Sequence, residues 1–483
     1  MEDIAMLIGD VPIGLSSSRE RQSLVNPATE EPFAEIPLAT MEDIDLAVAA
    51  ARDAFPGWSR LSPSVRGNYL RKASDLLSTR SEEIGRTMTL EMGKPVSEAI
   101  GEVQKAALAL RYYAEEGERV YGRIIANENS QFESSVLFQP LGPVAAITPW
   151  NYPVELLCWK TAAALSAGCT VVAKPASITP LSSLLFLRCI TDAGVPSGTV
   201  NIIFGSGSNV GDRLIGNPAL KKVAFTGSTE VGKRIVSMCG GMMKKVSAEL
   251  GGQCPLIVSN RARLEAAVED GVRRSFRNNG QICIAINRIF VQEDIYETFI
   301  RRFAEETAAL KIGDSLREAD CQLGPMATKS GRDKVIEHCE DALAKGARLI
   351  CGGNIPAGRN KGLFFEPTIL ADTRPEMKVM CEESFGPIVG IMPYTTKEEA
   401  LALANGTNYG LASYVYTDDF FEVEYFARNL ESGNVAINNP DAGVMNAPYG
   451  GWKDSGDGYE HGPEGLFSYL RIKHVRKRIS FPS

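Results

Sequence analysis

An apolar run ends in a polar turn at Val144-Ala145-Ala146-Ile147-Thr148-Pro149-Trp150-Asn151-Tyr152-Pro153, and a helical segment follows it. Residues 170–177 (TVVAKPAS) show the same order of strand, turn and helix, as do residues 200–207 and 222–228. Short β-rich runs separated by helices predict a mostly parallel sheet that is covered on both faces. We therefore expect a doubly wound α/β nucleotide-binding domain, in which ligands bind at the carboxyl ends of the strands.

The segments on either side of this domain carry other patterns. Residues 41–117 place apolar side chains at helical spacing, which predicts several packed helices. Around residues 120–141 this period is lost, and residues 132–138 are typical of a strand. A second α/β series follows Gly251 and Gly252, which form a plausible hinge between two domains.

The composition is that of an ordinary globular enzyme, with 44% hydrophobic and 23% charged residues. The net charge of −8 argues against nucleic acid as a partner. No stretch approaches the roughly 20 apolar residues of a membrane span, and no basic segment at the start suggests a signal peptide. The ten cysteines lack the spacing of a disulfide framework, so we expect a cytoplasmic protein. The three histidines form no metal-binding pattern, and we expect no metal.

One cysteine has the setting of a nucleophile. Residues 276–283 (FRNNGQIC) follow a helical stretch, and Gly280 lets the chain turn sharply and present Cys283. A base or nearby dipoles could then favour its thiolate. The alternative is a buried cysteine that acts only as a small apolar side chain. No histidine lies near in sequence, so we expect a carboxylate or a water-linked group as the base.

A turn after residue 225 has the setting of an anion site. Residues 226–232 (TGSTEVG) follow a strand and open a helix, where free N–H groups and the helix dipole can hold a phosphate. The turn lacks the GxGxxG fingerprint of dinucleotide domains. A helix cap formed by Ser228 or Thr229 explains the same residues equally well.

Taken together, these turns closely resemble motifs of the aldehyde dehydrogenase superfamily. PWNYP, KPAS, FTGSTEVG, ELGG, FRNNGQIC, EESFGP, NYGLAS and PYGGWKDSG occur in the order of that family across nearly the whole chain. The nearest branch is similar to succinate-semialdehyde dehydrogenases. The resemblance implies a dinucleotide-binding domain at 1–119 and 141–251, a catalytic α/β domain at 252–453, and a small β oligomerisation arm and tail at 120–140 and 454–483.

The resemblance also implies a catalytic role for each of three residues. Cys283 would attack the aldehyde carbon, Asn151 would stabilise the developing oxyanion, and Glu249 would activate the water that hydrolyses the thioester. The product would be the carboxylic acid. A thioesterase or acyl-transfer reaction of the same cysteine would be a side activity. A protein of this fold that only binds or supports other molecules is the alternative, and the presence of all three residues argues against it.

Further residues are implied for the cofactor, NADP or NAD. Lys174 would bind the adenosine ribose, Ser228 the pyrophosphate and Glu383 the nicotinamide ribose, and Phe385 would pack near the nicotinamide. Gly227 and Trp150, which lines the same strand end, would also belong to the cofactor site. Both aromatic residues could instead belong to the core. Many NAD-preferring members carry glutamate three residues after the lysine, where this chain has Ser177. The serine removes a charge that repels the 2′-phosphate and could donate a hydrogen bond to it, so we expect NADP to be used at least as well as NAD.

The substrate pattern is mixed. Arg277 matches the arginine that holds the substrate carboxylate in the semialdehyde branch, although a surface or interdomain salt bridge is the alternative. Two other expected carboxylate ligands are replaced by Trp159 and Gly443. Tyr152, Trp159 and Tyr449 would line the tunnel with aromatic rings. We expect a semialdehyde, or an aromatic aldehyde with an acidic or polar tail.

The resemblance further implies a homo-oligomer, either a dimer or a dimer of dimers. In the family, the segment at 120–141 and the tail from about residue 470 extend the sheet of a neighbouring subunit. The alternation in residues 134–138 (SSVLF) fits an edge strand that seeks a partner.

Overall fold

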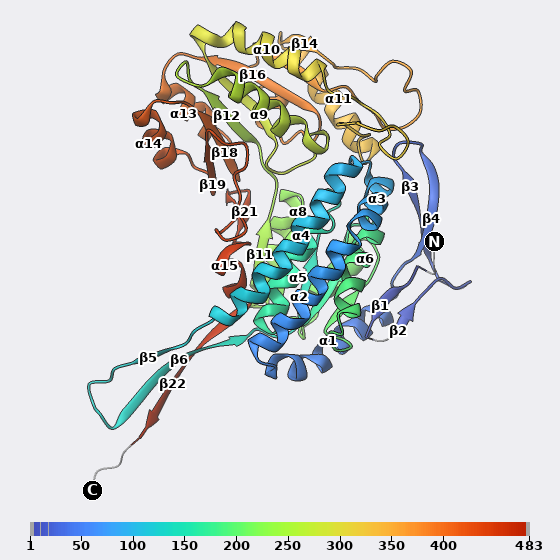
Figure 1. Ribbon diagram of the computed structural model, residues 1–483, viewed down its shortest axis with the longest axis vertical. Helices are drawn as coiled ribbons and strands as arrows, with labels where there is room; N and C mark the ends of the chain where they lie inside the picture. The colour runs from blue at the N-terminus through green and yellow to red at the C-terminus, as the bar shows by residue number, and fades with distance from the viewer. Residues whose placement is uncertain (1–3, 10, 18, 480–483) are drawn as a thin grey trace.

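The computed structural model describes residues 4–9, 11–17 and 19–479 (Figure 1). Its first sheet has the strand order β2-β1-β9-β8-β7-β10-β11-β21. The five central strands, from β9 to β11 in this order, run parallel to one another, and the pairs at the two edges are antiparallel. The bounds of these strands are β1 Met6–Ile8, β2 Val11–Ile13, β7 Val144–Ile147, β8 Val171–Lys174, β9 Val200–Ile202, β10 Lys222–Thr226, β11 Lys245–Glu249 and β21 Gly456–Asp457.

The strand order places a crevice at the carboxyl ends of the parallel strands, at the point where the order of the strands reverses (the switch point). The chain builds β7, β8 and β9 outward in one direction, then crosses back to add β10 and β11 on the other side of β7. The turns after β7 and β10 diverge at this switch point, which is where ligands bind in open parallel sheets. The expected doubly wound domain is therefore confirmed.

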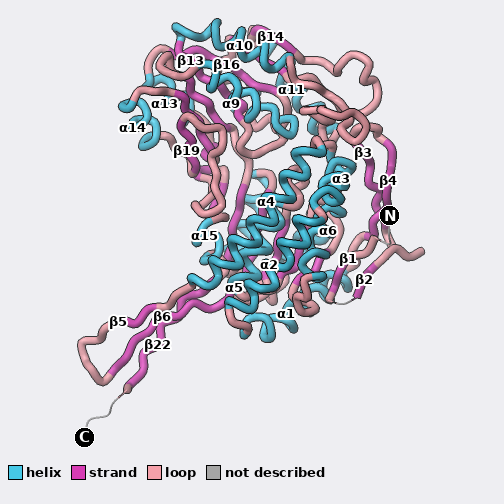
Figure 2. Tube along the Cα trace, viewed as in Figure 1, coloured by secondary structure: helices cyan, strands magenta, loops and turns pink. Residues whose placement is uncertain are grey.

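Helices cover both faces of the first sheet, and a short hairpin lies beside it (Figure 2). α5 is apolar on almost every side because it is packed against α4 and α2 as well as β7 and β8. The bounds are α1 Met41–Arg60, α2 Pro63–Thr79, α3 Ser81–Met92, α4 Val96–Glu116, α5 Glu155–Ala167, α6 Pro180–Asp192, α7 Asp212–Gly216, α8 Thr229–Gly241, with the short turns η1 Gly117–Arg119 and η2 Gly207–Gly211 and the hairpin β3 Arg21–Asn26 and β4 Glu31–Pro37.

The second sheet has the order β14-β15-β16-β13-β12-β18-β19, parallel except for β14. Successive residues of β12 enter different apolar clusters, Leu256 and Val258 on one face and Ile257 on the other, so both faces are buried. The bounds are β12 Cys254–Val258, β13 Ile286–Gln292, β14 Arg348–Cys351, β15 Thr368–Ala371, β16 Ile388–Tyr394, β18 Ala412–Tyr416, β19 Asn434–Ile437, α9 Leu264–Phe276, η3 Arg277–Gly280, η4 Glu293–Ile295, α10 Tyr296–Ala308, α11 Lys329–Ala344, α12 Lys378–Cys381, α13 Lys397–Asn405 and α14 Phe420–Asn429, with the separate pair β17 Tyr409–Gly410 and β20 Trp452–Lys453.

A three-stranded antiparallel arm projects from the body of the molecule (Figure 1). It consists of β5 Arg123–Ile125, β6 Phe132–Pro140 and β22 Leu470–Arg478, and β22 pairs with β6 along its whole length. Tyr121, Ile124 and Ile472 of this arm are more than 70% exposed. The arm therefore presents apolar side chains that the rest of the chain does not cover.

The segment between residues 454 and 469 differs from the expected tail. β21 pairs with β11 at the edge of the first sheet, and α15 Gly462–Phe467 packs against α5. These residues lie on the cofactor domain because β11 needs a partner on its open edge, and only β22 continues into the arm. We accordingly propose to assign 454–469 to the first domain, with the rest of the expected domain boundaries kept as a proposal.

Among the described residues, no helix is both long and apolar enough to cross a membrane.

Candidate active site

The chain enters Cys283 through a tight turn. Asn278, Asn279 and Gly280 all have positive φ, at 49°, 55° and 66°. Asparagine is one of the few residues that adopt this region readily, and at Gly280 a Cβ would lie 2.2 Å from the carbonyl oxygen of Gly386. The turn predicted at Gly280 is therefore present and extends over three residues. It ends α9 and leaves the Cys283 thiol half-buried.

Asn151 lies four residues beyond the end of β7, at the switch point of the first sheet. Its side-chain amide Nδ2 donates a hydrogen bond to the carbonyl oxygen of Gln281, at 2.9 Å, two residues before the nucleophile. An amide nitrogen carries two N–H groups, and this bond uses one of them. The other is available to an oxygen atom bound next to Cys283.

Glu249 ends β11 and is 4% exposed. Neither of its carboxylate oxygens has a hydrogen-bond partner among the described residues. Burial and the nearby charge of Glu460 raise the pKa of Glu249 well above its usual range, and Lys160 opposes this shift. A buried carboxylate without partners is suited to accept a proton from water.

These three residues line one cavity of about 120 Å³. Its wall carries the aromatic rings of Tyr152, Trp159 and Tyr449, and the rings of Trp159 and Tyr449 are 5.7 Å apart. The remaining lining residues are Lys105, Glu155, Leu156, Thr226, Arg274, Arg277, Ile282, Ile284, Asp441, Gly443 and His461. The structure thus brings together every residue that the sequence assigned to catalysis or substrate binding.

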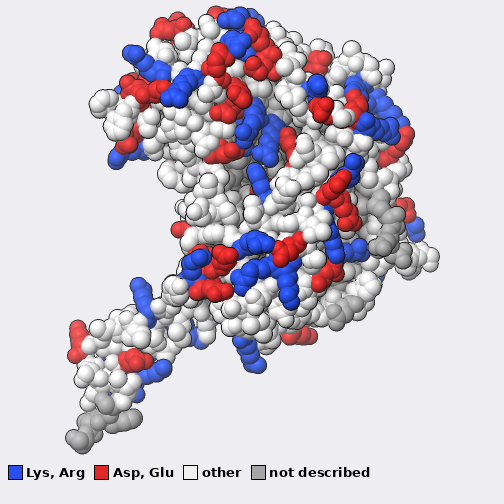
Figure 3. All heavy atoms as spheres, in the orientation of Figure 1, with Lys and Arg blue, Asp and Glu red and all other residues white. Residues whose placement is uncertain are grey.

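The position of Arg277 is compatible with both roles between which the sequence left a choice. It lines the cavity, and its Nε lies 3.7 Å from Oε2 of Glu98 on α4, so it also joins the two domains. Lys and Arg side chains gather in the hollow between the domains (Figure 3). Arg274 contributes to the charge at the cavity but is already paired with Asp441.

Sequence reasoning missed His461, because the nearest motif contains neither a nucleophile nor a base. The structure places its ring 4.0 Å from that of Trp159, centroid to centroid, on the wall of the cavity that holds Cys283. Burial lowers the pKa of His461 to about 4. It is therefore a neutral wall residue, and the carboxylate of Glu249 remains the candidate base.

The thiol of Cys283 lies in an environment that disfavours the thiolate. Burial raises its pKa to about 12, the hydroxyl of Tyr449 opposes this, and the charges of Glu383 and Glu249 add to it. A nucleophile with such a pKa reacts through its small thiolate fraction unless a bound ligand changes its surroundings.

A second cavity, of about 470 Å³, meets the first at Cys283. Asn151, Leu156, Thr226 and Cys283 line both cavities. The other lining residues are Pro149, Trp150, Gly227, Ser228, Leu250, Gly251, Thr328, Ser330, Gly331, Lys334, Glu383 and Phe385. Thr328, Ser330, Gly331 and Lys334 lie at the start of α11, and no motif in the sequence points to them.

This second cavity fits a dinucleotide. Ser228 precedes α8 but its side chain makes no capping bond, so the first N–H groups of that helix remain available to a phosphate. At the other side Glu383 lines the cavity and accepts a hydrogen bond from the Gly252 N–H at 2.9 Å, and its carboxylate would be free to accept further bonds from ribose hydroxyls. The rings of Trp150 and Phe385 meet edge to face at 5.6 Å, and both border the cavity.

Lys174 ends β8, beside β7 in the sheet, and Ser177 follows it; neither residue lines this cavity. The ammonium of Lys174 donates to the carbonyl oxygen of Pro175, and burial lowers the pKa of Lys174 to about 8. The hydroxyl of Ser177 donates to the carbonyl oxygen of Gly205 at 3.1 Å. The expected hydrogen bond from Ser177 to a 2′-phosphate would therefore require this bond to break.

No three His, Cys, Asp or Glu side chains of the described residues group closely enough to hold a metal ion.

The model of the aldehyde dehydrogenase family matches residues 15–475. This chain belongs to the aldehyde dehydrogenase family. It is 41% identical to 3-sulfolactaldehyde dehydrogenase of Pseudomonas putida over 95% of this chain and 94% of that protein. It is 40% identical to succinate-semialdehyde dehydrogenase [NADP(+)] of Escherichia coli (strain K12), over 95% of each chain. A crystal structure of an E. coli NADP-dependent enzyme superposes with a TM-score of 0.96 at 39% identity, covering 99% of this chain and 98% of that one.

Family membership makes this protein an NAD(P)-dependent aldehyde dehydrogenase. The identity of about 40% to a succinate-semialdehyde dehydrogenase confirms the resemblance to the semialdehyde dehydrogenase branch.

Proposed function

We propose that this aldehyde dehydrogenase oxidises an aldehyde with an anionic tail, such as a semialdehyde, with Cys283 as nucleophile. One observation carries the proposal. Cys283 lies where the substrate cavity meets the cofactor cavity, with Asn151 and Glu249 on the same wall. A nucleophile between two cavities can hold the substrate carbon next to a bound cofactor.

The residues of the site act in sequence. The thiol of Cys283 gives its proton to a water molecule and its sulfur bonds to the aldehyde carbon, and the free N–H of Asn151 donates to the resulting oxyanion. The bound nicotinamide supplies the hydride acceptor for the oxidation. Glu249 then takes a proton from a water molecule that attacks the thioester carbon, which releases the acid and returns the sulfur of Cys283.

The charge of Arg277 supports an anionic tail. Its guanidinium lines the cavity, and its ion pair with Glu98 is long, so a substrate carboxylate can compete for it. The relatives named above act, by their names, on succinate semialdehyde and 3-sulfolactaldehyde, which both carry an acidic group. The rings of Tyr152, Trp159 and Tyr449 favour a second candidate, an aromatic aldehyde with an acidic or polar tail.

A panel of aldehydes tests this function. We expect Arg277→Gln to lower kcat/KM for a carboxylate-tailed aldehyde by roughly 10- to 100-fold, the worth of one charge-assisted hydrogen bond, and to change an uncharged aldehyde of equal length by less than about threefold. Arg273→Gln is the matched control, because Arg273 lies on the same helical stretch but outside the cavity. Equal losses with both aldehydes would rule out an anionic tail.

We also propose that NADP is used at least as well as NAD, because Ser177 brings no negative charge to the ribose site. We further propose a dimer or a dimer of dimers assembled through the arm, whose exposed apolar residues support this.

A further inference from the structure

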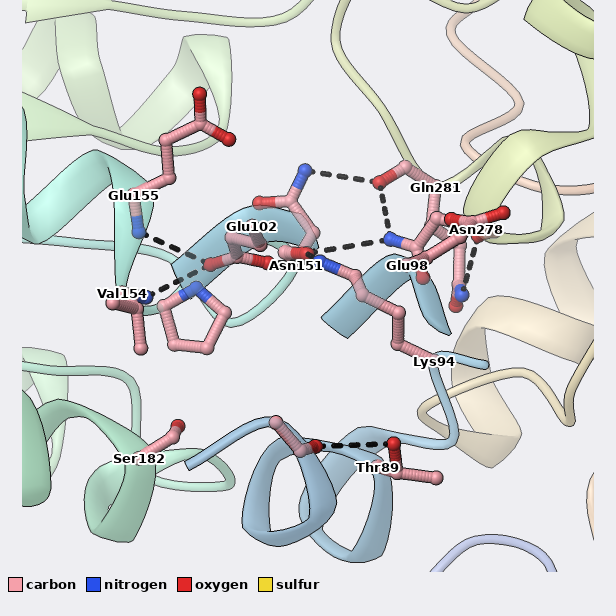
Figure 4. Close-up of polar contacts among 12 residues, drawn as sticks. Thr89, Lys94, Glu98, Glu102, Asn151, Val154, Glu155, Ser182, Asn278 and Gln281 are labelled. Atoms are coloured by element: carbon pink, nitrogen blue, oxygen red, sulfur yellow. Dashed lines mark hydrogen bonds and ion pairs between the residues drawn. The ribbon is translucent and has the colours of Figure 1, made fainter. Parts of the chain in front are cut away.

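The segment that carries Asn151 lies between β7 and α5, so its main chain is not held by the hydrogen bonds of a strand or a helix. β7 ends at Ile147 and α5 begins at Glu155, so the main chain between them has to find hydrogen-bond partners elsewhere. Several of those partners come from a buried pair of opposite charges, Lys94 and Glu102, whose side chains are 0% exposed (Figure 4).

Lys94 reaches this place because of an abrupt end to α3. Gly93 closes the helix with φ 80°, and Lys94 and Pro95 lead directly into α4. A Cβ on Gly93 would lie 2.5 Å from Pro325 Cγ, so the turn packs closely against the catalytic domain. The lysine side chain is thereby directed into the space between the domains.

The Lys94 ammonium makes three close contacts. It forms an ion pair with Glu102, donates to the carbonyl oxygen of Asn151 at 2.7 Å, and lies 3.5 Å from the centre of the Tyr152 ring. Burial lowers the pKa of Lys94, and the charge of Glu102 opposes that shift.

Glu102 holds the far end of the same stretch. Its Oε1 accepts hydrogen bonds from the N–H groups of Val154 and Glu155, at 3.0 and 3.1 Å. These are N–H groups at the start of α5 that lack a partner within the helix. The stretch from Asn151 to Glu155 is therefore fixed at its first carbonyl and at its last two amides by one ion pair.

The catalytic turn joins the same network. Asn278 Nδ2 donates to the Asn151 carbonyl oxygen and to the Gln281 carbonyl oxygen, both at 3.3 Å, and the Asn151 amide donates to Gln281 as well. The main chain of Asn151 is thus held from the cofactor domain by Lys94 and from the catalytic domain by Asn278. Neither Lys94 nor Glu102 lines the substrate or cofactor cavity.

We propose that Lys94 and Glu102 are positioning residues, which fix the main chain of Asn151 so that its free amide N–H points to the oxygen of the bound aldehyde. A buried ion pair is a costly way to join two helices, and an apolar pair of the same volume would often do this as well. Here the charges serve a geometric purpose, because they bind the carbonyl of Asn151 itself and the amides of Val154 and Glu155 that follow it. This inference rests on the proposed role of Asn151.

A double-mutant cycle tests it. The variant Lys94→Met/Glu102→Gln removes both charges and keeps an oxygen for the amides of Val154 and Glu155. We expect the single-turnover rate of reduced-cofactor formation, at saturating aldehyde, to fall at least about 30-fold, with the Kd of the cofactor changed less than about twofold. In an Asn151→Ala background the same change should lower the rate less than about threefold, because the donor is already absent.

The outcome of the cycle distinguishes a positioning role of Lys94 and Glu102 from a purely structural one. An equal loss of rate in both backgrounds, or no loss in either, overturns the positioning role. If Asn151→Ala does not slow the first turnover, the proposed function fails instead. If the double variant does not fold, Glu102→Gln alone takes its place in the cycle, and we expect the same changes in rate. Lys222→Met is the control, since Lys222 is also buried in this domain but donates to Ser247 and Ser468. It should lower the melting temperature and leave the rate within about twofold.

Discussion

The hydroxyl oxygen of Tyr449 lies 3.7 Å from Sγ of Cys283. This contact joins the nucleophile to a residue far along the chain, whose own backbone is held by reciprocal N–H to carbonyl bonds with Glu460. A hydroxyl near sulfur stabilises the thiolate by donating to it. The distance is within the range of a hydrogen bond to sulfur, so we expect the hydroxyl to affect the reactivity of Cys283.

Tyr449→Phe should therefore slow the alkylation of Cys283 by iodoacetamide. A hydrogen bond to a charged group contributes about 1.5 kcal/mol or more, which is roughly a tenfold change in the thiolate fraction. Because burial already raises the pKa of Cys283 to about 12, the wild-type rate without cofactor should increase steadily with pH. Peptide mass spectrometry follows the modified residue. A rate that levels off near neutral pH, or is unchanged in the variant, would contradict this.

Glu249→Gln should separate the two halves of the reaction. The amide cannot take a proton from water, so the thioester would persist while the first oxidation proceeds. Rapid mixing should show one equivalent of reduced cofactor in a burst, followed by a steady rate at least about a hundredfold lower than in the wild type. Cys283→Ala is the control and should show neither phase. A variant with normal steady turnover would exclude Glu249 as the base.

Glu155 should make the use of anionic aldehydes depend on pH. Burial, with the charge of Glu102, raises the pKa of Glu155 to about 7, and the side chain lines the substrate cavity. It is neutral below that pH and gains a negative charge above it, which repels a substrate carboxylate. We expect the ratio of kcat/KM for an anionic aldehyde to kcat/KM for an uncharged aldehyde to fall roughly fivefold from pH 6 to pH 8. Glu155→Gln should remove the decline in this ratio.

Ser177→Glu should shift cofactor preference toward NAD by roughly tenfold, or about 1.4 kcal/mol. The carboxylate would accept hydrogen bonds from the ribose hydroxyls of NAD and repel the 2′-phosphate of NADP. It would also remove the bond to Gly205, so Ser177→Ala, which loses only that bond, is the matched control. The specificity constants for both cofactors decide the question. A strong wild-type preference for NAD that the substitution leaves unchanged would contradict our account.

Ile472→Asp should disrupt assembly. Ile472 is 72% exposed on β22, where a charge would have to be buried if a second chain covers the arm. Light scattering at micromolar concentration should give the mass of an oligomer for the wild type and a smaller mass for the variant. Thr79→Asp, a change on the surface of α2, is the control and should keep the wild-type mass. A wild-type mass near that of one chain would exclude the proposed oligomer.

The sequence predicts the parallel strands of both sheets well, because strands such as β7 and β12 are apolar throughout and end in recognisable turns. It does not predict β1 or β21. Each contains only two or three residues, and each exists because the edge of a sheet offers it a partner. Local pattern contains no information about such distant pairing.

Some residues of the candidate site can be predicted from the sequence, and others are visible only in the structure. Asn151, Glu249 and Cys283 stand in motifs whose chemistry can be read from neighbouring residues. His461 and Lys94 stand in segments without a chemical pattern, and they reach the site only through helix packing. Lys94 in particular depends on the end of α3 at Gly93, a local feature whose consequence for Asn151 is visible only in three dimensions.

The pairing of β22 with β6 has a consequence for how the molecule is made. Residues 132–140 leave the ribosome long before residues 470–478, so β6 has no partner on that side while most of the chain is synthesised. In the same way, the outer edge of β11 has no partner until β21 has been synthesised. Exposed strand edges invite pairing with other chains, and the interval before the last strands emerge is when this protein is most open to aggregation.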